Sequence, residues 1–232
     1  MSGHPTGVDV SSWQHPGGAE IDWHAVVDAG YTFAIVKATQ GTTYANNWLV
    51  RDLDDARAAG LLVGAYHFYE AGQDAGVQAK HFVGMLMGQQ LELGVWLDWE
   101  PGPMPDWNAN TEYQTFLTAC EETRPNCGLY CAQSWLEPFK TTGAPIRRLW
   151  LPYPDVDTSA PVALIYQLNA TDVPGIPTPV NTNILSSARG LNIPTAPRAR
   201  PTAATAHSMV VQPEPEPEPE EPEPPEPTEP SG

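Results

Sequence analysis

The hexapeptide Val95-Trp96-Leu97-Asp98-Trp99-Glu100 predicts a short buried strand that ends on two carboxylates. Side chains alternate across a strand, so Asp98 and Glu100 share one face with Trp96 and lie roughly 6.5 Å apart along the chain. Like charges this close do not both ionise easily, and apolar surroundings raise a carboxyl pKa. One acid can therefore stay protonated near neutral pH while the other is charged, as glycoside hydrolysis requires. The alternative is a pair of acids in a solvated turn.

Charge and composition bound the class of protein. The chain has 232 residues, enough for one large domain, and a formal charge of -17. The segment 207–232 holds eight Glu and no Asp, Lys or Arg, which leaves -9 for the rest of the chain. Such an acidic body argues against nucleic acid and anionic membranes as partners, because phosphate binding needs clustered Lys and Arg. No apolar run is long enough to span a bilayer, so we expect no membrane insertion.

The N-terminus and the cysteines bear on the compartment. The first residues lack both a basic region and an apolar stretch, so we expect no secretory signal. Cys120, Cys127 and Cys131 are odd in number and have no His at metal-ligand spacing. We therefore expect no metal and no cofactor, and free buried thiols, with a Cys120–Cys127 bridge as the alternative.

The apolar pattern along the chain predicts an α/β fold. Strands are expected near residues 7–11, 33–38, 61–68, 95–100, 128–131, 149–153, 163–168 and 180–184. Helices are expected near residues 23–29, 46–59, 74–87 and 111–122, with a brief one after Ser134. Alternation at intervals of roughly thirty residues indicates βαβ units and a parallel sheet. We predict an irregular (β/α)-barrel with reduced later helices rather than an open doubly wound sheet, because no strand runs into a Gly-rich phosphate loop.

Polar and aromatic side chains collect where these strands end, and barrel active sites gather at that face. The residues are Asp9, Gln40, Tyr66, Glu100, Tyr130, Tyr153 and Gln167. Among the aromatic residues, Tyr66, Tyr130, Trp150 and Tyr153 either line sugar subsites or belong to the core. The histidines accompany no nucleophilic Ser or Cys constellation, so we expect His67 and His81 to be structural and His4, His15 and His24 to lie at the surface.

The chain changes character after Asn183. Residues 188–212 are predicted to form a linker, and residues 213–232 alternate Pro and Glu. The last segment cannot bury enough apolar surface to fold, so we predict a disordered acidic tail. It serves either as a solubilising spacer or as a binding segment.

Five segments together resemble glycoside hydrolase family 25, the N-acetylmuramidase lysozymes of bacteria and phages. They are Gly7-Val8-Asp9-Val10-Ser11-Ser12-Trp13-Gln14, Val36 to Gly41, Gly64 to Phe68, Leu97 to Glu100, and Tyr166-Gln167. The resemblance covers about residues 5–187, which would form the catalytic domain. It implies an irregular (β/α)-barrel, in agreement with the strand pattern.

The resemblance also implies roles for three acids. Glu100 would act as the general acid at the β-1,4 bond between N-acetylmuramic acid and N-acetylglucosamine. Asp98 would orient the 2-acetamido group or support the positive charge at the anomeric carbon, and Asp9 would hold the network and the sugar. Both a substrate-assisted route and direct attack by water are compatible with this pair.

Two positions depart from the family pattern. Gln40 stands where the family carries Glu, and Asn181 stands where Asp is usual. An amide still hydrogen-bonds a sugar but supplies no negative charge to the transition state. The side chains expected to bind substrate are Gln40, Tyr66, Tyr130, Trp150, Tyr153, Gln167 and Asn181. We expect activity to survive, reduced or shifted toward a modified glycan.

These implications predict a lysozyme that cleaves bacterial cell-wall peptidoglycan, as a monomer. Without a secretory signal, we expect a phage endolysin or lytic protein that is made in the host cytoplasm and acts on the wall after release. One alternative is a cell-wall glycan-binding module with weak or no turnover. Another is an interaction protein in which the acidic tail does the main work.

Overall fold

The computed structural model describes residues 4–100, 109–132, 134, 136, 146, 148–152 and 164–186. The expected linker 188–212, the expected tail 213–232 and Tyr153 lie outside the described residues. Their assignment stays a prediction.

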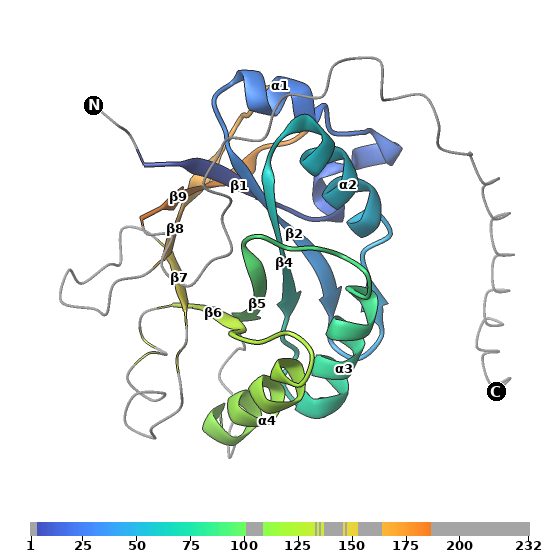
Figure 1. Cartoon of the computed structure of the whole chain (residues 1–232), viewed down its shortest axis with the longest axis vertical. Coiled ribbons are helices and arrows are strands. Elements are labelled where there is room, and N and C mark those ends of the chain that lie inside the picture. The colour runs from blue at the N-terminus through green and yellow to red at the C-terminus, as the bar shows by residue number, and fades with distance from the viewer. Residues whose placement is uncertain are drawn as a thin grey trace, which may run out of the picture. The chain divides into compact units, whose positions relative to one another are not determined.

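Eight strands close into a barrel (Figure 1). They are β1 (Thr6–Val10), β2 (Phe33–Gln40), β4 (Leu62–Phe68), β5 (Gly94–Trp99), β6 (Gly128–Cys131), β7 (Leu149–Pro152), β8 (Ile165–Thr171) and β9 (Val180–Leu185). The barrel closes because β1 pairs with both β2 and β9, and β3 (Tyr44–Ala45) adds to the edge of β2 only. The predicted irregular (β/α)-barrel is confirmed.

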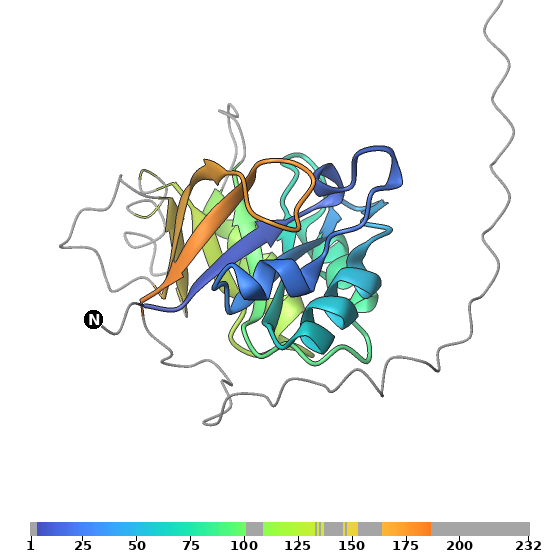
Figure 2. The ribbon, with the colours of Figure 1, turned by 90° about the horizontal axis from the view of Figure 1, so that it is seen from above.

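The last strand departs from the expected parallel sheet. β9 pairs antiparallel with both β8 and β1, whereas the pairings from β1 through β2, β4, β5, β6 and β7 to β8 are parallel. Only residues 172–179 join β8 to β9. A parallel crossover needs a dozen or more residues, so this connection can only turn back as a hairpin. Figure 2 shows the β8–β9 hairpin in orange beside β1 in blue.

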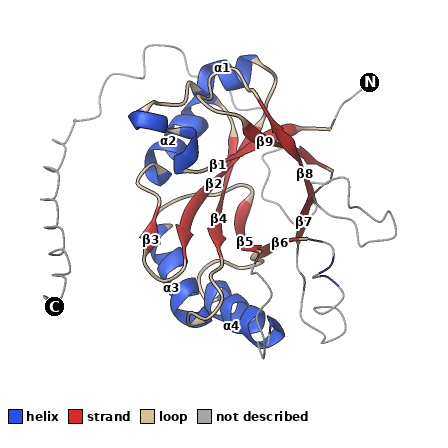
Figure 3. Ribbon diagram, turned by 180° about the vertical axis from the view of Figure 1, so that it is seen from behind, coloured by secondary structure: helices blue, strands red, loops and turns tan. Residues whose placement is uncertain are grey.

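Helices formed by the described residues lie outside the barrel (Figure 3). They include α1 (Trp23–Asp28), α2 (Leu49–Ala59), α3 (Ala75–Met85) and α4 (Ala109–Glu121). Asp22 and Asp74 cap α1 and α3 by accepting backbone N–H bonds, and Gly60 ends α2 in a left-handed conformation. Helix α2 begins later than predicted, because Asn46 donates to the Lys37 carbonyl instead. None of the helices formed by the described residues is long and apolar enough to cross a bilayer.

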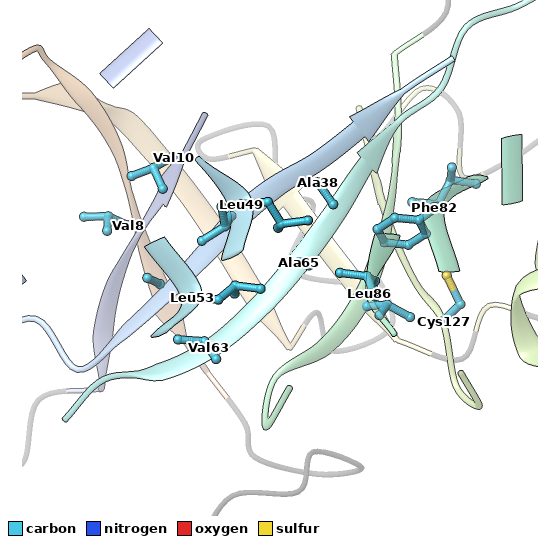
Figure 4. Packing of buried hydrophobic residues seen from close by; sticks show 14 of the residues in the cluster. Val8, Val10, Ala38, Leu49, Leu53, Val63, Ala65, Phe82, Leu86 and Cys127 are labelled. Carbon is cyan, nitrogen blue, oxygen red and sulfur yellow. The ribbon is translucent and has the colours of Figure 1, made fainter. Parts of the chain in front are cut away.

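The strands separate two cores, as the alternation in the opening hexapeptide predicts. Trp96 lies inside the barrel with Phe33, Ile35 and other apolar side chains. Leu97 and Trp99 lie on the outer face in the larger cluster between the strands and the helices. Figure 4 shows part of this outer cluster, including Leu53 of α2 over the sheet. Asp98 and Glu100 follow Trp96 along the strand and therefore emerge at the mouth of the barrel.

Two predictions about single side chains have different outcomes. The three cysteines are buried free thiols, so the prediction of free buried thiols is confirmed. The prediction that His15 lies at the surface is wrong. Its ring is buried, stacks on Trp48 at 3.9 Å and lies 3.0 Å from the Asp52 carboxylate. His15 stands between Gln14 and Pro16-Gly17-Gly18, a polar and Gly-rich stretch of sequence that gave no sign of this burial.

Candidate active site

Asp9 of β1 is the most densely hydrogen-bonded acid at the barrel mouth. Its Oδ2 accepts from Asn183 at 2.8 Å and from Gln167 at 3.0 Å, and its Oδ1 accepts from Asn181 at 3.5 Å. Burial raises the pKa of Asp9 to about 6, although the three amides oppose this shift by stabilising the charged form. Asp9 therefore changes its charge near the acid side of neutrality.

Two of these amides relay contacts from the barrel wall. The Tyr130 hydroxyl donates to Gln167 Oε1 at 2.8 Å, and the Trp150 indole N–H donates to Asn183 Oδ1 at 2.9 Å. With their oxygens so occupied, both amides turn their NH2 groups to Asp9. Trp150 is only 2 % exposed and packs against Tyr66, Trp96 and Tyr130, so it acts from within the barrel.

Asp98 of β5 is paired in register with Phe68 on β4 and Tyr130 on β6. Burial raises the pKa of Asp98 well above its usual value, and the charges of Glu100 and Asp9 raise it further, while Lys37 opposes the shift. Its Oδ1 is buried and receives no hydrogen bond from any side chain or backbone group that the structure describes. In the free protein the buried Asp98 is thus held towards its neutral form. The resemblance made Glu100 the proton donor and so implied that Asp98 would be the charged member of the pair.

Glu100 follows β5 and is exposed. The Tyr130 hydroxyl donates its one proton to the Gln167 that holds Asp9, and the negative charge of Glu100 is near enough to raise the pKa of Tyr130 beyond the effect of burial. Burial raises the pKa values of the Tyr66 and Tyr130 phenols most. The nearby carboxyl groups of Asp9, Asp98 and Glu100 raise both pKa values further. The structure therefore brings the three acids together around two phenols that stay protonated and can donate hydrogen bonds.

Lys37 and Gln40 complete this end of the barrel. The Lys37 ammonium donates to Gln40 Oε1 at 2.5 Å and lies 4.7 Å from the centre of the Phe68 ring. Burial lowers the pKa of Lys37, while the carboxylates of Asp98, Glu70 and Glu100 raise it. Lys37 is the positive charge that partly balances the acids.

A pocket of about 230 Å³ opens beside Asp9. Tyr66 and Asn181 line it, together with Trp13 and Gln14 from the 3-10 turn η1 (Ser12–Gln14). Trp13 is 82 % exposed although its turn is capped by a reciprocal Ser11–Gln14 box. A large aromatic side chain held in solvent next to polar groups suits the apolar face of a sugar ring.

The comparisons with known proteins agree with this geometry. The family model described as "Glycosyl hydrolases family 25" matches residues 8–166. The chain belongs to glycosyl hydrolases family 25.

Single relatives of this family 25 chain align in sequence with a smaller part of it than the family model does. Lysozyme M1 of Streptomyces globisporus is 40% identical over 77 residues, which are 33% of this chain and only 25% of that protein. The bacterial lysozyme from Streptomyces coelicolor has a structure similar to this one with a TM-score of 0.65 at 24% identity, covering 81% of this chain and 94% of that one. The catalytic domain of endolysin ply40 from bacteriophage P40 of Listeria monocytogenes gives 0.67 at 21% identity, covering 81% and 95%. These structural likenesses show the fold.

Sequence reasoning did not assign three residues that this family 25 site contains. Asn183 was visible only as the end of Asn181-Thr182-Asn183, yet it makes a shorter bond to Asp9 than Asn181 does. Trp13 belongs to the family motif from Gly7 to Gln14, but nothing in the sequence indicates that its ring is exposed. Glu70 contacts Gln40, and only the pairing of β2 with β4 brings them together. Among the described residues, no group of three His, Cys, Asp or Glu side chains is arranged to hold a metal ion.

Proposed function

We propose that this chain is a lysozyme that hydrolyses bacterial cell-wall peptidoglycan at the β-1,4 bond between N-acetylmuramic acid and N-acetylglucosamine. The observation that carries the proposal is the convergence of Asp9, Asp98 and Glu100 around Tyr66 and Tyr130 at the barrel mouth. The adjoining pocket with its exposed tryptophan supplies room for a sugar. Membership in family 25 supports the same class of reaction.

Glu100 is the proposed general acid. It is exposed at the end of the carboxylate pair, where a glycosidic oxygen can reach it. In the reaction it gives its proton to the leaving oxygen as the bond to the anomeric carbon breaks.

Asp98 is the proposed partner of the substrate's 2-acetamido group. A buried oxygen without a hydrogen bond is costly, so Asp98 Oδ1 is suited to accept a donor that arrives with the substrate. The acetamido N–H is such a donor, and holding it turns the acetamido oxygen toward the anomeric carbon for a substrate-assisted displacement. Asp9 holds the amides around it and supports the developing positive charge.

The cellular setting is part of the proposal. A phage endolysin, made in the host cytoplasm and acting as a monomer on the wall after release, agrees with the fold shared with the catalytic domain of a phage endolysin. Residues 5–187 would form the catalytic domain, and the acidic tail would be dispensable for cleavage.

Clearing of purified cell walls, with mass spectrometry of the released fragments, tests the proposal. The wild type should release fragments with a new reducing end on N-acetylmuramic acid. Glu100→Gln should lower the rate at least about a hundredfold. Glu122→Gln, which removes an exposed charge just after α4, is the matched control and should leave the rate unchanged. A wild type that binds walls without cutting them would instead establish the glycan-binding alternative.

A further inference from the structure

A chain of three side chains leads away from the active-site lysine. Lys37 donates to Gln40 Oε1 at 2.5 Å, and Gln40 Nε2 donates to Glu70 Oε1 at 2.7 Å. An ammonium can only donate and a carboxylate can only accept, so the orientation of the amide between them is fixed. Gln40 therefore connects the charge of Lys37 to the opposite charge of Glu70.

The backbone of Glu70 is held by a fully buried side chain. Gln78 accepts the Glu70 N–H at 2.9 Å and donates to the Glu70 carbonyl at 2.9 Å. Because the Gln78 oxygen can only accept, the neighbouring His67 must donate through Nε2, at 3.1 Å, and its Nδ1 accepts from Thr39 at 2.7 Å. Burial lowers the pKa of His67 to about 4, so the ring is neutral in this arrangement.

The carboxylate of Glu70 is held as firmly as its backbone. Gln73 donates to the oxygen that Gln40 does not use. Gly41 lets both side chains approach the end of β2, because a Cβ there would lie only 2.6 Å from Glu70 Oε2. With φ at +55°, position 41 also favours glycine for its backbone. These contacts together fix the position of the Glu70 carboxylate.

The groups that face Lys37 explain what that carboxylate can do. Asp98 approaches from β5, Glu100 from just after β5, and Glu70 from just after β4. The Tyr44 ring of β3 and the neutral His67 of β4 supply no charge. Among the described residues Lys37 forms no direct ion pair. A half-buried ammonium without such a pair loses its proton more easily, so its remote partners decide its charge.

We propose that Glu70 is a positioning residue of the active site: through Gln40 it holds the Lys37 ammonium in place and charged beside Asp98 and Glu100. The effect on catalysis rests on the proposed function, since it matters only if those acids act on a substrate. A charged Lys37 stabilises the negative charge that the acid pair carries after Glu100 has given up its proton.

Titration of the Lys37 ammonium by NMR tests, without reference to activity, whether Glu70 helps to keep Lys37 charged. Glu70→Gln keeps an oxygen that accepts from Gln40 and removes only the charge, so the Lys37 titration should move to lower pH. The reciprocal variant Gln40→Glu/Glu70→Gln brings the carboxylate directly to Lys37 and should move the titration back to the wild-type pH or above it. An unchanged titration in Glu70→Gln would overturn the proposal, whatever the enzyme does with cell walls.

The pH dependence of wall clearing then tests the consequence for catalysis. In Glu70→Gln the alkaline limb of kcat should shift to lower pH, with a loss of roughly three- to tenfold on that limb and little change in KM. The reciprocal variant should recover the wild-type limb, and Glu122→Gln should match the wild type. A purely structural role would instead lower stability and leave the limb where it is, and that result would overturn the catalytic part. A wild type without lytic activity would refute the proposed function while the NMR result still stands.

Discussion

Asn183 donates a 2.8 Å hydrogen bond to Asp9 and accepts one from the Trp150 indole. Trp150 can only donate, so the fully buried amide has no freedom to turn its oxygen toward Asp9. Asn183→Asp would place a second carboxylate against Asp9 in a buried setting. We expect a loss of about 2–4 kcal/mol in the free energy of unfolding at pH 7, measured by urea denaturation, together with loss of wall clearing.

Asn181→Asp is the matched control for that change. Asn181 lies 3.5 Å from Asp9 and lines the pocket, where a new carboxylate remains hydrated. We expect its stability to stay within about 1 kcal/mol of the wild type, and wall clearing to be kept or raised, because the charge would face the developing positive charge of the sugar. Equal losses in the free energy of unfolding in the two variants would contradict the claim that Trp150 fixes the orientation of the Asn183 amide.

Trp13 should contribute to sugar binding without contributing to stability. Its ring is 82 % exposed, so Trp13→Ala should change the free energy of unfolding by less than about 0.5 kcal/mol. Loss of the stacking surface should raise KM for wall fragments about three- to tenfold and leave kcat within about twofold. Met87→Ala removes a comparably exposed side chain away from the pocket lining, and a KM effect of the same size there would refute a specific role for Trp13.

Asp9 should make the domain less stable as the pH rises. Its pKa is about 6 in the folded protein and near 3.8 when unfolded, so its contribution favours the folded state below pH 4 and is lost as the pH rises to about 6. Asp9→Asn has no ionisable group at this position and therefore lacks this pH-dependent contribution to stability. Relative to the wild type, the variant should gain up to about 3 kcal/mol between pH 4 and pH 7 in urea denaturation, while wall clearing falls. A constant difference between the two proteins across that range would contradict the raised pKa.

The strand pattern was enough to predict the barrel because each strand carries its own signal. The hexapeptide from Val95 to Glu100 is apolar on both faces until its acids, and the structure divides its side chains between the two cores accordingly. The direction of β9 was not predicted, because alternation is the same in parallel and antiparallel strands. Only the short connection 172–179 carries that information.

The site was predictable where residues share a strand and not where the fold joins distant ones. Asp98 and Glu100 could be paired from their spacing alone. The contacts of Glu70 with Gln40 span thirty residues, and those of Asn183 with Asp9 span 174. Which aspartate of the mouth would be pushed towards the neutral form also depended on burial and on neighbouring charges, which spacing does not reveal.

His15 should stabilise the turn that follows β1. Its Nδ1 lies 2.9 Å from the Ala19 carbonyl and must donate, and its Nε2 lies 3.0 Å from Asp52 Oδ2. His15→Ala would leave the buried Asp52 carboxyl without this partner and open a void against Trp48. We expect a loss of about 2–4 kcal/mol in the free energy of unfolding at pH 7, measured by urea denaturation. His24→Ala, at an exposed position in α1, should change the free energy of unfolding by less than about 0.5 kcal/mol. A similar loss in the two variants would contradict a stabilising role for the buried contacts of His15.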